Sequence, residues 1–361
     1  MQGGHQPNTP MTDKYRFPAE WEPQSAVLIA WPHAGTDWAD RLEQVEETYI
    51  ALVEAITRFQ PAIVCVSDDD VQAYARARLA SARIDMERVH FIDVPYDDTW
   101  LRDSGPITLD GGGGHRLLDF RFTGWGGKFE ASQDDRLVEH LHADGVFGDA
   151  ERSTIDFALE GGAIDTDGRG TLLTTWQCLH ERHPDASREE LTARLAEWLQ
   201  QDRVLWLDHG YLEGDDTDAH VDTLARFAAV DAIVYQGCDD PSDSHYAELQ
   251  AMGRELAALR TTDGAPYRLF ELPWAPPVID NGRRLAASYA NFLIVNGAVL
   301  MPAYGQDDAG RRVDQAAADV LSQAFPGREI VQVPCRPLIW QNGSLHCVTM
   351  QLPAGAVGTL T

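Results

Sequence analysis

The stretch NFLIVNGAVLMP (291–302) contains two apolar runs that are joined by Asn296 and Gly297. An Asn-Gly pair between two apolar runs is a strong sequence signal for a β-hairpin. A segment with helical periodicity follows at 312–325, and a further strand-like run, EIVQVP, lies at 329–334. This region therefore combines a hairpin with a strand–helix–strand unit, and it predicts a mixed α/β fold.

The same mixture extends along the rest of the chain. Further strands are expected at 26–31, 62–67, 88–95, 116–122, 170–176, 203–208, 232–236 and 344–352. Further helices are expected at 38–58, 70–80, 187–201 and 246–259, the third opened by a capping box of Ser187 and Glu190. Helical units recur roughly every 60–70 residues, which suggests divergent repeats. The G-x-G-x-x-G of a dinucleotide-binding fold is absent. We expect one domain over 13–361 after a flexible tail at 1–12.

The charge balance restricts the classes of partner. The chain has 361 residues with 29 Lys+Arg and 57 Asp+Glu, a formal net charge of −28, and 44% hydrophobic residues. The apolar share is sufficient for a sizeable core. Such an excess of acid argues against binding to nucleic acid and to anionic membranes. A small cationic molecule fits the sign better, although most of the charge is expected to serve solubility.

The thiols and the amino terminus indicate a cytoplasmic protein. The cysteines are odd in number, widely spaced and without a CxxC pair, so neither a disulfide framework nor a cysteine zinc site is expected. The amino-terminal residues lack the apolar stretch of a signal peptide, and no run of about 18 apolar residues occurs. We therefore expect reduced thiols and no association with membranes.

Polar and glycine residues gather in five places, each at the end of a strand-like run. They are DDTWLRDSGP (97–106), FTGWGGKF (122–129), LEGG (159–162), DDTDAHVD (215–222) and QNGSLHC (341–347). Loops at the ends of strands are where a scaffold usually presents its working side chains. These five clusters are therefore the candidate locations of the functional residues.

Three residues in these clusters suit covalent and acid–base chemistry. Cys347 is a candidate nucleophile at the start of a strand, with a buried structural cysteine as the alternative. His220 and Asp222 form an H-x-D pair that an extended segment would place on one face, where the carboxylate favours the protonated imidazole. The alternative for this pair is a surface turn. His180 and His183 lack the spacing of a metal site, so no metal is expected.

The remaining candidates suit the binding of a planar cation. Asp103 follows Trp100 closely, and an acid beside an indole offers both charged hydrogen bonds and a stacking face. Glu160 could supply a second acid, while Trp125 by itself is only an aromatic turn. Several acids near a nucleophilic sulfur would repel the oxyanion of an ester or peptide. They fit a guanidinium, which carries the positive charge itself.

Seven motifs resemble, in order, those of the agmatine deiminase and bacterial peptidylarginine deiminase family, within the guanidine-modifying superfamily. They are PAEWEPQSAVLIAWP (18–32), DDTWLRDSGP, GWGGKF, LEGGAIDTDGRGTLLTTWQCL (159–179), DTDAHVD, ASYANFLIVNG (287–297) and GSLHCVTMQ. The resemblance implies a five-bladed α/β propeller, the pentein fold, built from ββαβ-type units around a pseudo-fivefold axis. It covers the chain from about Phe17 to Pro353.

The resemblance also implies a role for each candidate residue. Cys347 would be the nucleophile and His220 the acid and base, with Glu160 close to His220. Asp103 and Asp222 would clamp the guanidinium. The pocket would be lined by Trp100, Trp125 and Asn291.

The activity implied is hydrolysis of agmatine to N-carbamoylputrescine and ammonia through a covalent cysteine adduct, without metal or organic cofactor. The alternatives are the same chemistry on peptidylarginine or another guanidine, an amidinotransferase, and a non-catalytic binding propeller. A homo-oligomer is expected only by analogy with relatives. The chain departs from the family pattern at QNGSL (341–345), Met350 and Ala219. These departures surround the catalytic residues, so they affect the identity of the substrate more than the type of reaction.

Overall fold

The computed structural model describes residues 15–359, so the expected tail at 1–12 lies outside the described residues. Mixed α/β architecture, as the sequence predicted, is observed throughout this range. Of the helices in the described part, none is both long and apolar enough to cross a membrane.

Four three-stranded sheets follow one another along the chain. In each, the first strand pairs antiparallel with the second, and the second pairs parallel with the third. They are β4 (Ile107–Gly111), β5 (Gly114–Arg121) and β6 (Glu151–Ala158); β7 (Ile164–Thr166), β8 (Thr171–Thr175) and β9 (Arg203–Leu207); β10 (Ala225–Ala229), β11 (Ala232–Gln236) and β12 (Arg268–Leu272); and β15 (Leu293–Val295), β16 (Ala298–Ala303) and β17 (Glu329–Pro334).

A fifth sheet joins the two ends of the chain. Strand β18 (Met350–Pro353) pairs antiparallel with β1 (Gln24–Ala30), which runs parallel to β2 (Ala62–Val66), and β2 runs parallel to β3 (Val89–Asp93). A separate two-stranded hairpin consists of β13 (Val278–Asp280) and β14 (Arg283–Leu285). The antiparallel-then-parallel pattern therefore occurs five times in the described chain.

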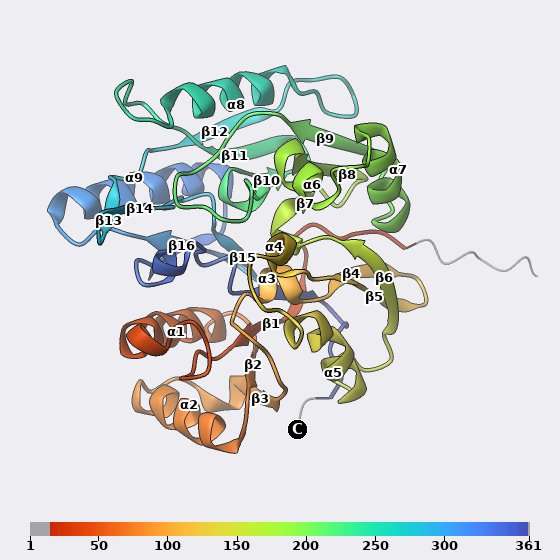
Figure 1. Ribbon diagram of the computed structural model, residues 1–361, viewed down its shortest axis with the longest axis vertical. Coiled ribbons are helices and arrows are strands. Elements are labelled where there is room, and N and C mark those ends of the chain that lie inside the picture. The colour runs from red at the N-terminus through yellow and green to blue at the C-terminus, as the bar shows by residue number, and fades with distance from the viewer. Residues whose placement is uncertain (1–14, 360–361) are drawn as a thin grey trace, which may run out of the picture.

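Helices occupy the crossovers that parallel strands require. They are α1 (Leu42–Thr57), α2 (Asp69–Ser81), α5 (Leu137–Ala143), α6 (Trp176–Arg182), α7 (Arg188–Trp198), α8 (Tyr246–Ala258) and α9 (Asp308–Ala324). The shorter helices are α3 (Leu101–Ser104), α4 (Gly124–Gly127), η1 (Ala39–Arg41), η2 (Met86–Arg88), η3 (Asp134–Arg136), η4 (Gly161–Ala163), η5 (Val221–Thr223) and η6 (Leu338–Gln341). Figure 1 shows α3 near the middle of the view, with α1, α2, α7 and α8 towards its edge.

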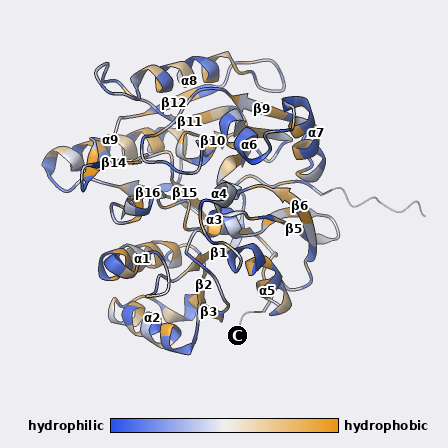
Figure 2. Cartoon of the chain, in the orientation of Figure 1, coloured by the Kyte–Doolittle hydropathy of each residue, from blue (hydrophilic) through white to orange (hydrophobic). Residues whose placement is uncertain are grey.

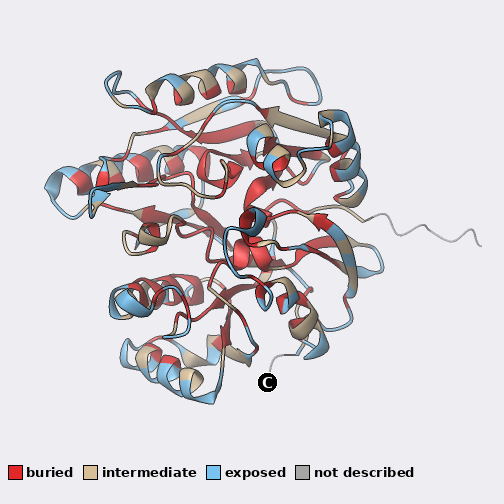
Figure 3. Ribbon diagram, in the orientation of Figure 1, coloured by how far each residue is buried: buried red, intermediate tan, exposed pale blue. Residues whose placement is uncertain are grey.

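Burial follows this arrangement. Strands β2 and β11 are buried along their whole length, whereas α7 buries only Leu191 and Leu195. In Figure 2 the strands are largely coloured as hydrophobic, whereas the outer turns of the helices are coloured as hydrophilic. Figure 3 shows buried residues at the centre, including the polar helix α3. A buried helix that carries Arg102 and Asp103 indicates that polar groups converge there, because unpaired charges are costly to bury.

Several local predictions are confirmed. The sequence 291–302 forms the hairpin of β15 and β16, and Gly297 in its turn has a φ of 81°, a conformation that glycine adopts without strain. The capping box at Ser187 and Glu190 is present at the start of α7.

Two local predictions are wrong, and both concern the site. The strand expected at 344–352 begins only at Met350, because the segment before it turns, with Thr349 N–H donating to the His346 carbonyl at 3.1 Å. Cys347 therefore lies in a turn and not at the start of a strand. The H-x-D pair does not lie on an extended segment, since His220 precedes the 3₁₀ helix η5 that contains Asp222.

Candidate active site

The candidate residues come from widely separated elements and are all buried. Asp103 lies on α3, and Glu160 and His220 immediately precede η4 and η5. Asn291 precedes β15, and Cys347 precedes β18. The most exposed of these side chains, and of Asp222, is only 5% accessible. A group of six polar residues that is buried so completely requires mutual pairing.

Three of these residues converge on Gly162. A Cβ atom at this position would lie 2.6 Å from His220 Nδ1, 2.8 Å from Asp103 Oδ1 and 3.2 Å from Asp222 Oδ2. The Gly162 N–H also donates to Asp103 Oδ1 at 3.0 Å. The second glycine of the LEGG motif is therefore required because any side chain would occupy the space in which the acids and the imidazole meet.

Asp103 is held by groups from two directions. Its Oδ2 accepts from Trp125 Nε1 at 2.9 Å, in addition to the Gly162 contact. Trp125 has a φ of 56°, a left-handed conformation that is costly for a bulky residue and that clusters at functional sites. Burial raises the pKa of Asp103 to about 6; the positive charge of His220 opposes this shift, and Asp222 and Glu160 reinforce it.

His220 lies between two carboxylates. Its Nδ1 is 3.7 Å from Asp103 Oδ1, and its Nε2 is 3.6 Å from Glu160 Oε2. Neither ring nitrogen has a hydrogen-bond partner among residues 15–359. Burial disfavours the imidazolium, but the charges of Asp103 and neighbouring groups outweigh it and hold the pKa of His220 well above its usual value. The ring is therefore suited to enter a reaction as an acid.

Glu160 depends on an arginine that the sequence analysis missed. Arg182 Nε donates to Glu160 Oε1 at 2.7 Å, and Arg182 also pairs with Asp218 at 2.6 Å. Burial would raise the pKa of Glu160, but His220 and Arg182 together lower it to about 2. Arg182 lies just beyond the motif at 159–179, in a helical sequence that carries no sign of this contact.

Asp222 is oriented by a second missed residue, His346. The His346 ring lies between two acids, with Nδ1 2.7 Å from Asp222 Oδ2 and Nε2 2.9 Å from Glu20 Oε2. Glu20 in turn accepts from Arg226 at 2.8 Å. Burial favours the neutral acid, but the contact with His346 outweighs it and lowers the pKa of Asp222. Asp222 Oδ1 is buried and has no hydrogen-bond partner in the part of the chain that the structure describes, so it can accept a hydrogen bond from a bound cation.

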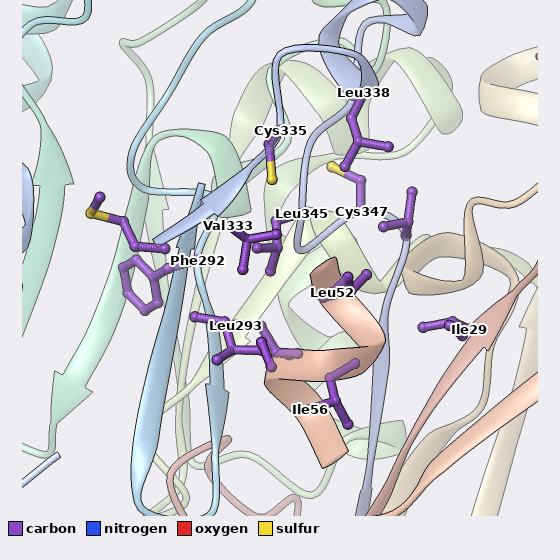
Figure 4. Packing of buried hydrophobic residues seen from close by; sticks show 14 of the residues in the cluster. Ile29, Leu52, Ile56, Phe292, Leu293, Val333, Cys335, Leu338, Leu345 and Cys347 are labelled. Carbon is purple, nitrogen blue, oxygen red and sulfur yellow. The ribbon is translucent and has the colours of Figure 1, made fainter. Parts of the chain in front are cut away.

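Cys347 borders both the polar group and the apolar core. Asn291 Nδ2 donates to its Sγ at 3.3 Å, and the Sγ lies 3.9 Å from Asp222 Oδ2. Figure 4 shows Cys347 beside Leu338 and Leu345 in the apolar cluster. Burial, followed by the charges of Asp222 and Asp103, raises the pKa of Cys347 well above that of a free thiol. A cation at this point would reverse the effect of the two acids.

A cavity of about 320 Å³ leads to Cys347. Its wall includes Asp103, Trp100 and Trp125, and the two indoles lie edge to face at 6.5 Å. Six further acids also line it: Asp37, Asp97, Asp98, Glu130, Asp134 and Asp216. We call these six residues the acidic wall.

Basic side chains balance little of the acidic wall. Lys128 Nζ donates to the Asp216 carbonyl oxygen at 2.5 Å, but its ion pair is with Asp218. Of the described residues that line the cavity, none is Lys or Arg, and within residues 15–359 no member of the acidic wall has an ion pair within 4.0 Å. Burial raises the pKa of Asp98 to about 7 and that of Asp134 to about 8. Positive charge on a bound ligand would favour the ionised forms of these two acids, so the cavity is suited to a cation.

The other sequence candidates have simpler roles. His180 stacks on Trp176 and His183 on Phe157, so neither joins the site. Met350 approaches Arg102 behind the site, with Sδ 3.6 Å from the guanidinium. Ala219, immediately before His220, has a φ of 68°, where glycine would be unstrained.

The chain belongs to the Porphyromonas-type peptidyl-arginine deiminase family, whose model matches residues 16–353. This finding confirms the resemblance inferred from the motifs.

Individual relatives cover nearly the whole chain. Agmatine deiminase of Stutzerimonas stutzeri (strain A1501) is 35% identical over 373 residues, covering 96% of this chain and 98% of that protein. A solved structure of a candidate arginine deiminase from Porphyromonas gingivalis is 44% identical, with a TM-score of 0.86 and coverage of 96% and 100%. A Cys-to-Ser variant of C. jejuni agmatine deiminase, solved with substrate bound, is 32% identical, with a TM-score of 0.85 and coverage of 96% and 98%.

Proposed function

We propose that this protein is an agmatine deiminase, which hydrolyses agmatine to N-carbamoylputrescine and ammonia. The observation that carries the proposal is the acidic wall, which lines the same cavity as Asp103, and none of the described residues that line this cavity is Lys or Arg. Agmatine bears a guanidinium at one end and an ammonium at the other, so both ends meet acids. Free arginine, or arginine at a peptide carboxyl terminus, would bring a carboxylate against the same wall, where like charges repel.

The guanidinium would lie between Asp103 and Asp222. The unpartnered Oδ1 of Asp222 accepts one N–H of the substrate, and the ionised form of Asp103 offers a second negative charge. The indole of Trp100, on the cavity wall, supplies an aromatic surface for the planar cation. Binding therefore uses charge, hydrogen bonding and stacking together.

The bound cation prepares Cys347 for attack. Its charge offsets the two acids that raise the pKa of Cys347, so the thiol loses its proton to water and the thiolate forms beside the substrate. Sulfur then bonds to the central guanidinium carbon. His220, present as an imidazolium, donates a proton to the departing nitrogen, the C–N bond breaks, and ammonia leaves.

Hydrolysis of the adduct returns the enzyme to its starting state. The neutral His220 takes a proton from water as the water oxygen bonds to the same carbon. The C–S bond then breaks and the second proton of the water passes to the departing sulfur, which releases the ureido product and restores the Cys347 thiol. Nucleophile, acid and base are all side chains of this chain, so we propose no metal or organic cofactor for the reaction.

We further propose that residues 13–361 form a single domain in which the five sheets close around the site as blades of a propeller. The fivefold occurrence of the antiparallel-then-parallel pattern supports this arrangement, as does the position of polar α3 near the centre of Figure 1.

A substrate panel tests the proposed function. Agmatine, free arginine and a peptide with carboxyl-terminal arginine are compared for release of ammonia and formation of ureido product. Peptidylarginine is included because the matching family model is named for it. We expect kcat/KM for agmatine to exceed both others by at least about 100-fold, since like-charge contacts cost several kcal/mol. A preference for the arginine peptide would contradict the assignment.

A further inference from the structure

Glu160, His220 and Cys178 bring three different metal-ligating atoms together. Cys178 lies on α6, and its Sγ is 3.9 Å from Glu160 Oε2, while His220 Nε2 is 3.6 Å from the same oxygen. The ligand atoms of the three residues all lie within 4.8 Å of one another, and all three residues are buried. The proposed reaction does not use Cys178.

The two separations that involve Glu160 Oε2 are close to the edges of a zinc tetrahedron. Bonds of about 2.0–2.2 Å to oxygen and nitrogen and about 2.3 Å to sulfur separate neighbouring ligands by roughly 3.3–3.7 Å at the tetrahedral angle. The two distances to Glu160 Oε2 therefore need a contraction of only a few tenths of an ångström. Thiolate, imidazole and carboxylate are also the three ligand types that zinc prefers.

The three ligands are available for a metal. Both ring nitrogens of His220 are buried and, among the described residues, have no hydrogen-bond partner. Arg182 binds Oε1 of Glu160 and is also paired with Asp218, so the arginine charge is shared between two acids. Glu160 Oε2 accepts from the Cys178 thiol, whose proton would be lost when a metal binds. A thiolate and a carboxylate would neutralise the charge of a divalent cation.

We propose that Glu160, Cys178 and His220 form a reversible inhibitory site for Zn²⁺, with water as the fourth ligand. On binding, a Zn–S bond replaces the S–H bond of Cys178, and a Zn–N bond replaces the N–H bond at Nε2 of the His220 imidazolium. Two protons are released for each ion bound, so binding strengthens as pH rises. The metal holds His220 in place and removes the proton that it would donate. This inhibitory consequence rests on the proposed function, whereas binding does not.

Binding is tested without reference to catalysis. Purified protein is titrated with Co²⁺, whose bond to thiolate gives near-ultraviolet charge-transfer absorption, and with Zn²⁺ in equilibrium dialysis. Wild type and Cys347→Ala should bind one ion with the same affinity and the same absorption band. Cys178→Ser and Cys178→Ala should lose the band and bind Zn²⁺ at least about tenfold more weakly. Cys238→Ser, a change at another buried cysteine, should behave as wild type.

The result that would overturn the site is unchanged binding in both Cys178 variants, or loss of binding in Cys347→Ala, which would locate the ion on the proposed nucleophile. Circular dichroism of each variant establishes that it is folded. Having two Cys178 variants keeps the test decisive if one of them fails to fold.

Activity then tests inhibition. Zn²⁺ should inhibit ammonia release from agmatine by wild type and by Cys238→Ser, and a chelator should restore it. Cys178→Ala should keep its activity and require at least about tenfold more Zn²⁺ for the same inhibition. Equal inhibition of Cys178→Ala would refute the inhibitory role. If no guanidine is hydrolysed by any variant, the proposed function fails while the binding titration still decides the metal site.

Discussion

Replacing Gly162 with alanine should damage the site by displacing its reacting groups. The added Cβ would lie 2.6 Å from His220 Nδ1 and 2.8 Å from Asp103 Oδ1, whereas ordinary contact begins at 3.4 Å. These groups must therefore move by roughly 0.6–0.8 Å, and a misplacement of about 1 Å can cost 100-fold in rate. We expect kcat/KM to fall by about 100-fold. Overpacking should also lower the free energy of unfolding by about 1–3 kcal/mol.

The measurement combines steady-state ammonia release with thermal unfolding of the same preparation. Gly253→Ala on α8 is the matched control, because its Cβ would lie 3.5 Å from the Tyr235 ring, an ordinary contact. That variant should keep wild-type kcat/KM and gain up to about 1 kcal/mol, since alanine favours a helix over glycine. A Gly162→Ala enzyme with kcat/KM within a few-fold of wild type would refute the argument that these groups converge on Gly162.

Three further changes test the charges and the nucleophile. Cys347→Ala should reduce ammonia release by at least about 1,000-fold with the fold intact by circular dichroism, and measurable turnover above that level would exclude Cys347 as the nucleophile. Asp222→Asn keeps the shape of the side chain but loses its charge, so kcat/KM for agmatine should fall by at least about 30-fold, as the loss of one partner of a buried charge pair costs about 2–5 kcal/mol. An unchanged value would show that the free Oδ1 does not contact substrate. KM for agmatine should fall about tenfold from pH 6 to 8.5, because Asp98 and Asp134, with pKa values raised to about 7 and about 8, lose protons and gain negative charge in this interval. Butylguanidine, which lacks the distal ammonium, should show a smaller fall, and an equal fall for both compounds would contradict the role of the acidic wall.

Much of the fold could be predicted because its signals are local. The Asn-Gly turn, the capping box and the apolar runs each act over a few residues, and the observed hairpin and α7 agree with them. The prediction of a strand through Cys347 was wrong. Leu345, Val348 and Met350 are apolar and buried, as the residues of a strand would be, but the backbone turns between Leu345 and Met350. Tertiary contacts with Asn291 and Arg102 hold this turn.

Some residues of the site could be predicted from the sequence and others could not, for a related reason. Unusual combinations such as His-x-Asp and Glu-Gly-Gly can be recognised in a sequence as candidate functional motifs. The structure brings the residues of these motifs together. Arg182 and His346 could not be recognised as functional from the sequence, because arginine in a helix and histidine beside apolar residues are common. Their importance arises from partners such as Glu20, which lies 326 residues from His346 along the chain.

The sequence by itself determined the kinds of chemistry available: a thiol, an imidazole, several carboxylates, and a large excess of negative charge. Only the tertiary structure decided three features of residues 15–359: one Asp222 oxygen has no partner there, six acids of a single cavity form no ion pair there, and Cys178 lies close to His220. The physical reason is that residue type and periodicity are properties of neighbours along the chain. Desolvation, charge coupling and vacant hydrogen-bonding positions depend on distances in space between residues that the chain separates widely.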